Sequence, residues 1–309
     1  MRTTASSMCR VGLLLLLAGA GADAFAKAAR SFPTPEAAVD ALVAAGRTGD
    51  TKKVLDVLGS DAKSLVTSGD AVADRAASQT FLERYDQSHA LVPGTDGKQT
   101  LVMGSDQWPF PIPLVQGKSG WAFDVEAGKD EILARRIGRN ELDAIQVCLA
   151  YVDAQREYRD HNPEGTVPPA YARQLVSTQG KRDGLFWPAS PEKGESPLGP
   201  LVGGVTGEGY HVEAGKLTPY HGYFYRILTA QGPHAEGGAV NYLVNGKLYG
   251  GFALIAWPAT YRSSGITTFQ VNHAGVVFQK DLGPDTAAKA KAIKTFDPDS
   301  TWSKAQPSP

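Results

Sequence analysis

The sequence has little cysteine and almost no excess of charge of either sign. Only two of its 309 residues are cysteines, and 31 lysines and arginines face 32 aspartates and glutamates. A net charge of -1 gives no field that would attract a polyanion, so we expect no nucleic-acid partner. Charged residues at 20% and aromatic residues at 9% are typical of a folded globular protein and exclude a disordered chain.

Long hydrophobic runs are also scarce, and the clear one lies at the N-terminus. Arg2 and Arg10 precede the apolar stretch 11–18, and the small residues Ala24 and Ala26 follow it. This order predicts a Sec-type signal peptide over residues 1–26, cleaved after Ala26, and hence a periplasmic or secreted protein; an uncleaved N-terminal anchor is the alternative. No later segment reaches the roughly 18 apolar residues of a membrane span, so we expect no transmembrane helix after signal removal.

Removal of the signal peptide leaves a single cysteine, Cys148. An intrachain disulfide is therefore excluded, although the predicted destination is oxidising. Cys148 lies in the apolar run 145–149, where a free cysteine is usually a small, inert core residue. We expect a packing role for it rather than a nucleophilic one.

The linear motifs of common catalytic sites are missing as well. The chain contains no G-x-S-x-G, no phosphate-binding G-x-x-x-x-G-K-[ST] and no zinc-binding H-E-x-x-H. The glycine-rich stretch 203–209 follows a predicted loop rather than a strand, which argues against a dinucleotide site. We expect no cofactor, and the missing motifs favour a protein without catalysis. A catalytic triad built from residues far apart in the sequence would leave no such motif, so an enzyme stays open as the alternative.

Residues 31–125 are predicted to form a helical module with a small antiparallel sheet. Thr34 as N-cap and Pro35 at the first helical position indicate a helix over 34–46. Prolines recur through 108–113, which fits an edge strand or bulge because proline cannot donate to a sheet ladder. Further helices are expected over 51–58 and 71–88, and strands over 100–103, 112–115 and 121–124.

Residues 126–302 are predicted to form a second module, with a long helix packed on an antiparallel sheet and a loose tail over 303–309. We expect a helix over 127–137 that stops at Gly138 and restarts at Asn140, with Asp143 placed as in a capping box, and continues to residue 159. Dense proline, glycine and serine over 180–209 indicate a long loop with one or two turns of helix.

The chain is predicted to be rich in strands from residue 220 onward. Asn245 and Gly246 both tolerate positive φ and mark a type I′ hairpin between strands over 239–244 and 247–256. Residues 252–257 are apolar on both faces, so that strand should be covered on both sides. The other expected elements are strands over 222–229, 266–271 and 276–280 and a closing helix over 285–294.

One polar segment resembles part of a calcium-binding loop. Asp160, Asn162 and Glu164 occupy positions 1, 3 and 5 of that pattern directly after the predicted long helix. The bidentate glutamate expected at position 12 is replaced by Tyr171. We therefore treat these residues as weak calcium candidates and favour a polar loop that ends the helix, without a metal.

Aromatic and cationic residues gather at the start of the strand near 222. Tyr220, His221, Tyr223 and Arg226 are candidate ligand-binding residues, with Trp108 from the first module, and His221 is the candidate base because imidazole titrates near neutral pH. The alternative is a packed strand whose histidine bonds a backbone carbonyl.

A third group of charges lies at the predicted helix junction. It consists of Arg135, Arg136, Arg139 and Glu141. We interpret it as an ion-paired or solvated junction rather than an anion site.

Five segments together resemble one known family. They are IGRNEL (137–142), YVDAQREY (151–158), STQGKRDGLFW (177–187), PYHGYFYRILTAQGP (219–233) and GGFALIAWP (250–258), and they look like the secreted bacterial domain-of-unknown-function family 2950. The resemblance covers nearly the whole mature chain. It implies export to the cell envelope and no particular reaction.

Two further resemblances concern the fold. The helix over 140–158 followed by the strands between 222 and 278 is similar in order to the head of a type IV pilin or pseudopilin, although the chain lacks the prepilin processing motif. Residues 35–39, 48–50 and 120–123 are similar to parts of the nuclear-transport-factor-like cone fold.

The sequence thus predicts an α+β protein and leaves two functions open. The first is a non-enzymatic envelope protein that binds a partner protein or a small ligand and carries a pilin-like C-terminal module. The second is a periplasmic hydrolase with His221 in a cleft. A carboxylate within hydrogen-bond reach of His221 would favour the enzyme, and burial of the ring against a carbonyl would disfavour it.

Overall fold

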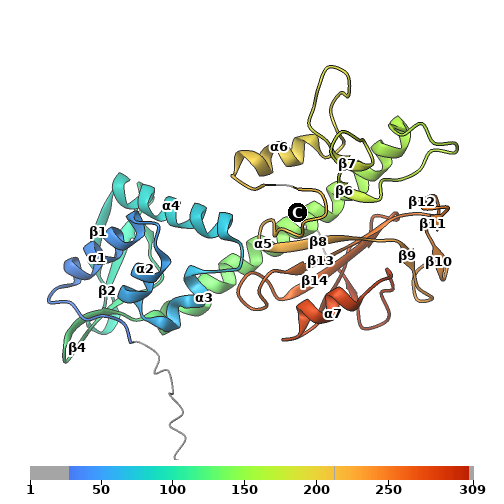
Figure 1. Ribbon diagram of the computed structural model, residues 1–309. Helices are drawn as coiled ribbons and strands as arrows, with labels where there is room; N and C mark the ends of the chain where they lie inside the picture. The colour runs from blue at the N-terminus through green and yellow to red at the C-terminus, as the bar shows by residue number, and fades with distance from the viewer. Residues whose placement is uncertain (1–27, 212, 306–309) are drawn as a thin grey trace, which may run out of the picture.

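A computed structural model describes residues 28–211 and 213–305 (Figure 1). The predicted signal peptide lies outside the described residues. The chain is an α+β protein, as the sequence predicts, with helices and antiparallel sheets in both halves. Figure 1 shows an N-terminal part and a C-terminal part arranged along one long helix, α5. No helix in the described ranges is long and apolar enough to cross a membrane.

The N-terminal part consists of short helices against a small sheet. Its helices are α1 (Pro35–Arg47), α2 (Thr51–Leu58), α3 (Lys63–Val66) and α4 (Ala71–Gln87), with a short 3-10 turn over Ser60–Ala62. The side chains of Thr34, Asp50 and Asp70 accept hydrogen bonds from the first turns of α1, α2 and α4, so these three helices begin where capping residues place them. The predicted helices are confirmed to within a residue or so at each end.

The sheet of the N-terminal part is antiparallel and has the order β1-β2-β4-β5, with β3 paired to β2. Its strands are β1 (His89–Pro93), β2 (Gln99–Met103), β3 (Trp108–Pro109), β4 (Leu114–Gly117) and β5 (Gly120–Phe123). The two-residue β3 is the edge piece that the prolines predict. The strand expected over 112–115 begins two residues later, after Pro113, and β1 was not predicted.

Helix α5 (Val125–His161) corrects the predicted break at Gly138. It is one helix of 37 residues, and Gly138 lies on its surface with open space around it. A single glycine in a helix disfavours it by only about 1 kcal/mol, and packing on both sides outweighs this. Ile132 and Leu133 pack in the N-terminal core, whereas Ile145 and Val152 belong to the C-terminal core.

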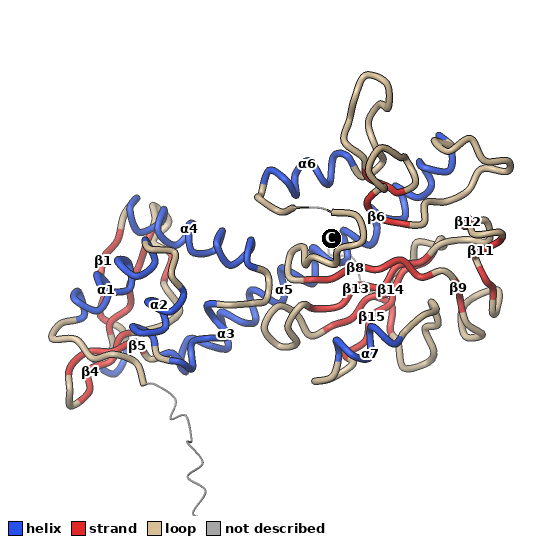
Figure 2. Tube along the Cα trace, viewed as in Figure 1, coloured by secondary structure: helices blue, strands red, loops and turns tan. Residues whose placement is uncertain are grey.

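The C-terminal part is built on a second antiparallel sheet in the order β16-β15-β14-β13-β8. Its strands are β8 (Tyr223–Leu228), β13 (Ala253–Pro258), β14 (Thr267–Asn272), β15 (Phe278–Asp281) and β16 (Ser303–Lys304). Helix α5 packs on one face and α7 (Thr286–Ala292) on the other, so every residue of β13 is buried, as the sequence predicts (Figure 2). The predicted loose tail is wrong at its start, because Ser303 and Lys304 pair with β15.

The Asn245-Gly246 turn forms as predicted, but the hairpin around it is shorter than expected. Both residues have positive φ, 48° and 77°, and they join β11 (Leu243–Val244) to β12 (Lys247–Leu248). The strand expected over 247–256 is interrupted at Gly251, whose φ of 141° suits glycine; a Cβ at this position would lie 2.7 Å from Nδ1 of His273. The preceding stretch splits likewise, and β10 (Val240–Asn241) pairs with β9 (Ala230–Gln231).

The stretch 180–209, predicted as a loop with one or two turns of helix, contains one short strand and one short helix, and the strand pairs with another that lies just before the stretch. Strands β6 (Gln174–Val176) and β7 (Gly184–Phe186) pair in parallel, and α6 (Gly199–Gly207) contains most of the glycine-rich stretch. Leu198 and Val202 pack onto the core shared by α5 and the sheet. Helix α6 therefore lies over α5 on the face of the sheet opposite α7 (Figure 2).

Candidate functional site

His221 lies immediately before β8, between two carboxylates. Its Nδ1 is 2.7 Å from Oδ2 of Asp143 on α5, and its Nε2 is 2.9 Å from Oε2 of Glu208, just after α6. The His221 side chain is 26% exposed. His221 and Gly222 both have positive φ, 47° and 74°, and this turn points the ring back toward α5. The ring is thus within reach of carboxylates, not buried against a carbonyl.

Between two ionised carboxylates, the geometry favours a protonated ring. A carboxylate only accepts hydrogen bonds, so each ring nitrogen must carry a hydrogen to bond its partner, which makes His221 an imidazolium. Burial lowers the pKa of His221, but the hydrogen bonds and charges of Glu208 and Asp143 outweigh burial and raise it above its usual range. With its partners, the imidazolium forms a charge-assisted bridge between α5 and the end of α6.

Asp70 forms a second polar junction next to this bridge. Its Oδ1 caps α4 by accepting from the amides of Val72 and Ala73, each at 3.1 Å. Its Oδ2 accepts from the hydroxyl of Tyr210 and the amide of Gly222, each at 2.9 Å. The carboxylate is 1% exposed, so one buried residue joins the N-terminal part to two segments of the C-terminal part.

An apolar cavity lies beside these two junctions. Its volume is about 140 Å³, and α5, β6, the start of α6, β8 and β13 all contribute to its walls. The apolar walls include Val147, Tyr151, Leu175, Leu201, Tyr225 and Leu254. Residues 208–211 and 213–220, here called the wall segment, close the remaining side with Tyr210, His211 and residues 216–220.

Aromatic contacts connect the cavity with the polar junctions. The ring of Tyr220 lies 5.1 Å from that of Tyr210, edge to face, and 4.1 Å from that of His221. Burial raises the pKa of Tyr220 to about 12, with a smaller contribution from the charge of Glu208. Burial and the nearby charge of Asp70 raise the pKa of Tyr210 as well. Both tyrosines therefore stay neutral near pH 7 and present ring surface to the cavity.

Only two of the five predicted ligand-binding residues meet at this site. Tyr220 and His221 do, whereas Tyr223 lies in the core and donates to the carbonyl of Thr267 at 2.9 Å. Arg226 lies on the opposite face of the sheet, where it donates to the carbonyls of Ala290 and Ile293 at the end of α7. Trp108 lies in the N-terminal part, flanked by the guanidinium groups of two arginines.

Sequence analysis missed most of the partners of His221. Asp143 was interpreted as a helix-capping residue, but the helix does not restart there and its carboxylate bonds His221. Asp70, Glu208 and Tyr210 were not identified. The signal available for Asp70 was its place before α4, where an aspartate is expected as a cap and gives no hint of its second role.

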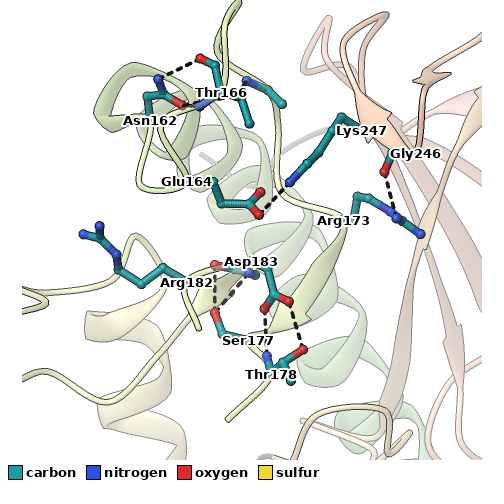
Figure 3. Close-up of polar contacts among 12 residues, drawn as sticks. Asn162, Glu164, Thr166, Arg173, Ser177, Thr178, Arg182, Asp183, Gly246 and Lys247 are labelled. Atoms are coloured by element: carbon teal, nitrogen blue, oxygen red, sulfur yellow. Dashed lines mark hydrogen bonds and ion pairs between the residues drawn. The ribbon is translucent and has the colours of Figure 1, made fainter. Parts of the chain in front are cut away.

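Two of the three weak calcium candidates are engaged in protein contacts. Oδ1 of Asn162 accepts from the amide of Thr166 at 2.9 Å, and Oε1 of Glu164 pairs with Nζ of Lys247 at 2.6 Å (Figure 3). Asp160 is exposed. Asn162 has φ of 45° and ends α5, so this segment is a helix-ending loop. Across the residues that the structure describes, no group of three or more His, Cys, Asp or Glu side chains could hold a metal ion.

The charge cluster on α5 connects the two parts of the protein. Arg136 donates to the carbonyls of Ser64 and Leu65, and Oε1 of Glu141 accepts from the amides of Ile266 and Thr267, each at 3.0 Å. Arg135 forms an ion pair with Glu131 one turn away, and Arg139 is exposed. The cluster is therefore better described as a junction of paired charges than as an anion site.

Cys148 is fully buried in the core, and burial raises the pKa of its thiol to about 12. The thiolate is therefore negligible near neutral pH, as its apolar neighbours in sequence suggest.

The comparison with protein families gives one match. The model of the family described as "Protein of unknown function (DUF2950)" matches residues 29–305. The chain belongs to this family. The match spans both parts of the structure, so the cavity and the His221 bridge lie inside the family region. No curated protein and no solved structure matches the chain.

Proposed function

We propose that this DUF2950 protein is an exported envelope protein that binds an apolar group in the cavity beside His221, without catalysis. The observation that carries the proposal is the cavity itself, which is apolar and walled on one side by the wall segment. Concave apolar sites with a few convergent polar groups are the usual form of a binding site. The signal peptide expected over 1–26 supports export.

The size of the cavity limits what it can hold. Drug-sized ligands occupy pockets of roughly 300–1,000 Å³. An apolar cavity of about 150 Å³ in another protein accepts one benzene molecule, and the cavity here is about 140 Å³. The occupant is therefore one aromatic ring or one branched aliphatic group. It belongs either to a small molecule or to an anchoring side chain of a partner protein, a common form of interface hot spot.

A hydrolase centred on His221 is the second candidate. The 2.7 Å contact between His221 and Asp143 favours it, because an aspartate that orients a histidine is the basis of many acid–base sites. The contact with Glu208 counts against it, since a general base needs a free nitrogen lone pair and both ring nitrogens are engaged. Binding is therefore the better supported function.

The pilin-like arrangement remains part of this proposal. Helix α5 packs against β13 and β14, and β8, β13, β14 and β15 pair in antiparallel fashion in the order in which they follow α5. This supports a pilin-like head used for interaction in the envelope.

Binding is tested by titrating the mature chain with toluene and following the amide spectrum by NMR. We expect saturable shifts at residues around the cavity. Val147→Trp, which extends a ring from the rigid α5 into the cavity, should abolish them. Leu142→Trp is the matched control on the same helix, since Leu142 is 44% exposed and does not line the cavity, and it should leave binding unchanged. Absence of saturable shifts in the parent protein would refute the cavity as a binding site.

The hydrolase alternative has its own test. Ester and amide substrates with a single aromatic group should be turned over by the mature chain and not by His221→Gln if the alternative holds. The binding proposal expects no turnover by either protein. Fractionation of expressing cells tests the location, and recovery of the chain in the cytoplasm with residues 1–26 intact would contradict export.

A further inference from the structure

The wall segment is tied to the rest of the protein close to its two ends. Near its start, Glu208 bonds His221 and Tyr210 bonds Asp70. Near its end, Tyr220 pairs with the backbone of Tyr223. Between these points, Nζ of Lys216 pairs with Oε2 of Glu213 at 2.7 Å, and both residues belong to the segment. Among the described residues, the Glu208 contact is therefore the charge-assisted one that ties the start of this segment to His221.

The bridge depends on the charge of one ring. When His221 is protonated, it donates to Asp143 and to Glu208 at the same time. When it loses a proton, only one nitrogen still donates, and the other presents a lone pair to a carboxylate. Asp143 lies on the rigid α5, whereas Glu208 is 49% exposed and lies on the wall segment. Glu208 can therefore separate from the ring with less loss of packing than Asp143 can.

The other groups around the ring do not replace this charge. The wall segment adds the neutral phenol of Tyr210, and Tyr220 lies beside the ring. The start of α4 adds a further negative charge, Asp70, one residue away at the amide of Gly222. The turn packed behind Gly222 contributes Ala259 and Ser264, which carry no charge. His211 and Lys216 of the wall segment line the cavity, and Lys216 is paired with Glu213. Among the described groups that contact the ring or its turn, deprotonation of His221 therefore leaves acidic and neutral ones.

We propose that the Asp143–His221–Glu208 bridge is a proton-controlled latch on the cavity: the protonated ring holds the wall segment closed, and loss of the proton releases Glu208 and opens the wall. The claim that the latch controls access to the cavity rests on the binding function proposed above. The claim that protonation of His221 holds the wall segment in place does not depend on that function. The raised pKa of His221 sets its direction. The latch is intact below the ordinary histidine range near 6.5 and is lost as the pH rises through the higher value of the folded protein.

Hydrogen exchange of the mature chain without any ligand tests the latch. After correction for intrinsic exchange, amides of 208–211 and 213–218 should exchange roughly two to five times faster at pH 9 than at pH 6, the factor expected for a partly exposed charge pair. Glu208→Gln should exchange fast at both values. NMR titration of the His221 ring should show a pKa above 6.5 in the parent protein and a lower one in Glu208→Gln.

Glu213→Gln is the matched control. It removes the same charge from the same segment, but its partner Lys216 also lies in the segment, so the pH response should match that of the parent. Equal exchange at pH 6 and pH 9 in the parent protein would overturn the latch, as would an unchanged pH response in Glu208→Gln. Toluene binding is measured separately. If the parent protein binds no toluene but its exchange depends on pH, the cavity function alone is refuted. If it binds toluene but its exchange is the same at pH 6 and pH 9, the latch alone is refuted.

Discussion

Replacing Asp70 by alanine should destabilise the protein far more than loss of a helix cap does. Loss of the cap on α4 costs about 1 kcal/mol. The substitution also removes the acceptor for the hydroxyl of Tyr210 and the amide of Gly222, two donors in a buried setting. Each unsatisfied donor costs about 1–3 kcal/mol. Adding the cap and the two donors, we expect a total loss of about 3–7 kcal/mol in the free energy of unfolding, measured by urea titration.

Asp50→Ala provides the matched control for this prediction. Asp50 caps α2 through the amide of Lys52 at 2.9 Å but is exposed and joins no second element, so its loss should cost about 1 kcal/mol. Tyr210→Phe removes one of the two junction bonds and should fall between the two alanine variants. If Asp70→Ala were no more destabilising than Asp50→Ala, the junction between the two parts of the protein would contribute nothing and the reasoning would be wrong.

Two further outcomes follow from burial and backbone conformation. Cys148 in the native protein should react with a thiol reagent at least a hundredfold more slowly than in urea. The thiol is inaccessible, and burial raises its pKa to about 12. Fast labelling of the native protein would show that the core opens readily. Gly222→Ala should lower the urea midpoint of unfolding more than Gly215→Ala does. Both residues have positive φ, but a Cβ at 222 would lie 2.5 Å from Nδ2 of Asn140, whereas the space around 215 is open. Equal midpoints would mean that the turn before β8 adjusts freely.

Local signals in the sequence predicted elements well where a few adjacent residues determine them. The cap at Thr34, the proline after it and the Asn245-Gly246 turn all form as expected. Gly138 misled the prediction because propensity favours a break there by only about 1 kcal/mol, while α5 is held by cores on both sides of it. The length of α5 is therefore a tertiary effect that sequence periodicity does not show.

The candidate site could be predicted only in part, for the same reason. Tyr220 and His221 were identified from composition, but Asp143 and Asp70 lie 78 and 152 residues from their partners at this turn and meet them only through the fold. Arg226 was wrongly grouped with Tyr223. The two-residue period of a strand already places positions 223 and 226 on opposite faces, so this error was avoidable.

The central claim, that the cavity beside His221 binds an apolar group, is tested most directly by crystals of the mature chain soaked with toluene at pH 6. The account predicts electron density for one ring between Val147 on α5 and Tyr220 on the wall segment, and no such density in Val147→Trp crystals. An empty or water-filled cavity in the parent crystals, with toluene elsewhere on the surface or absent, would contradict it.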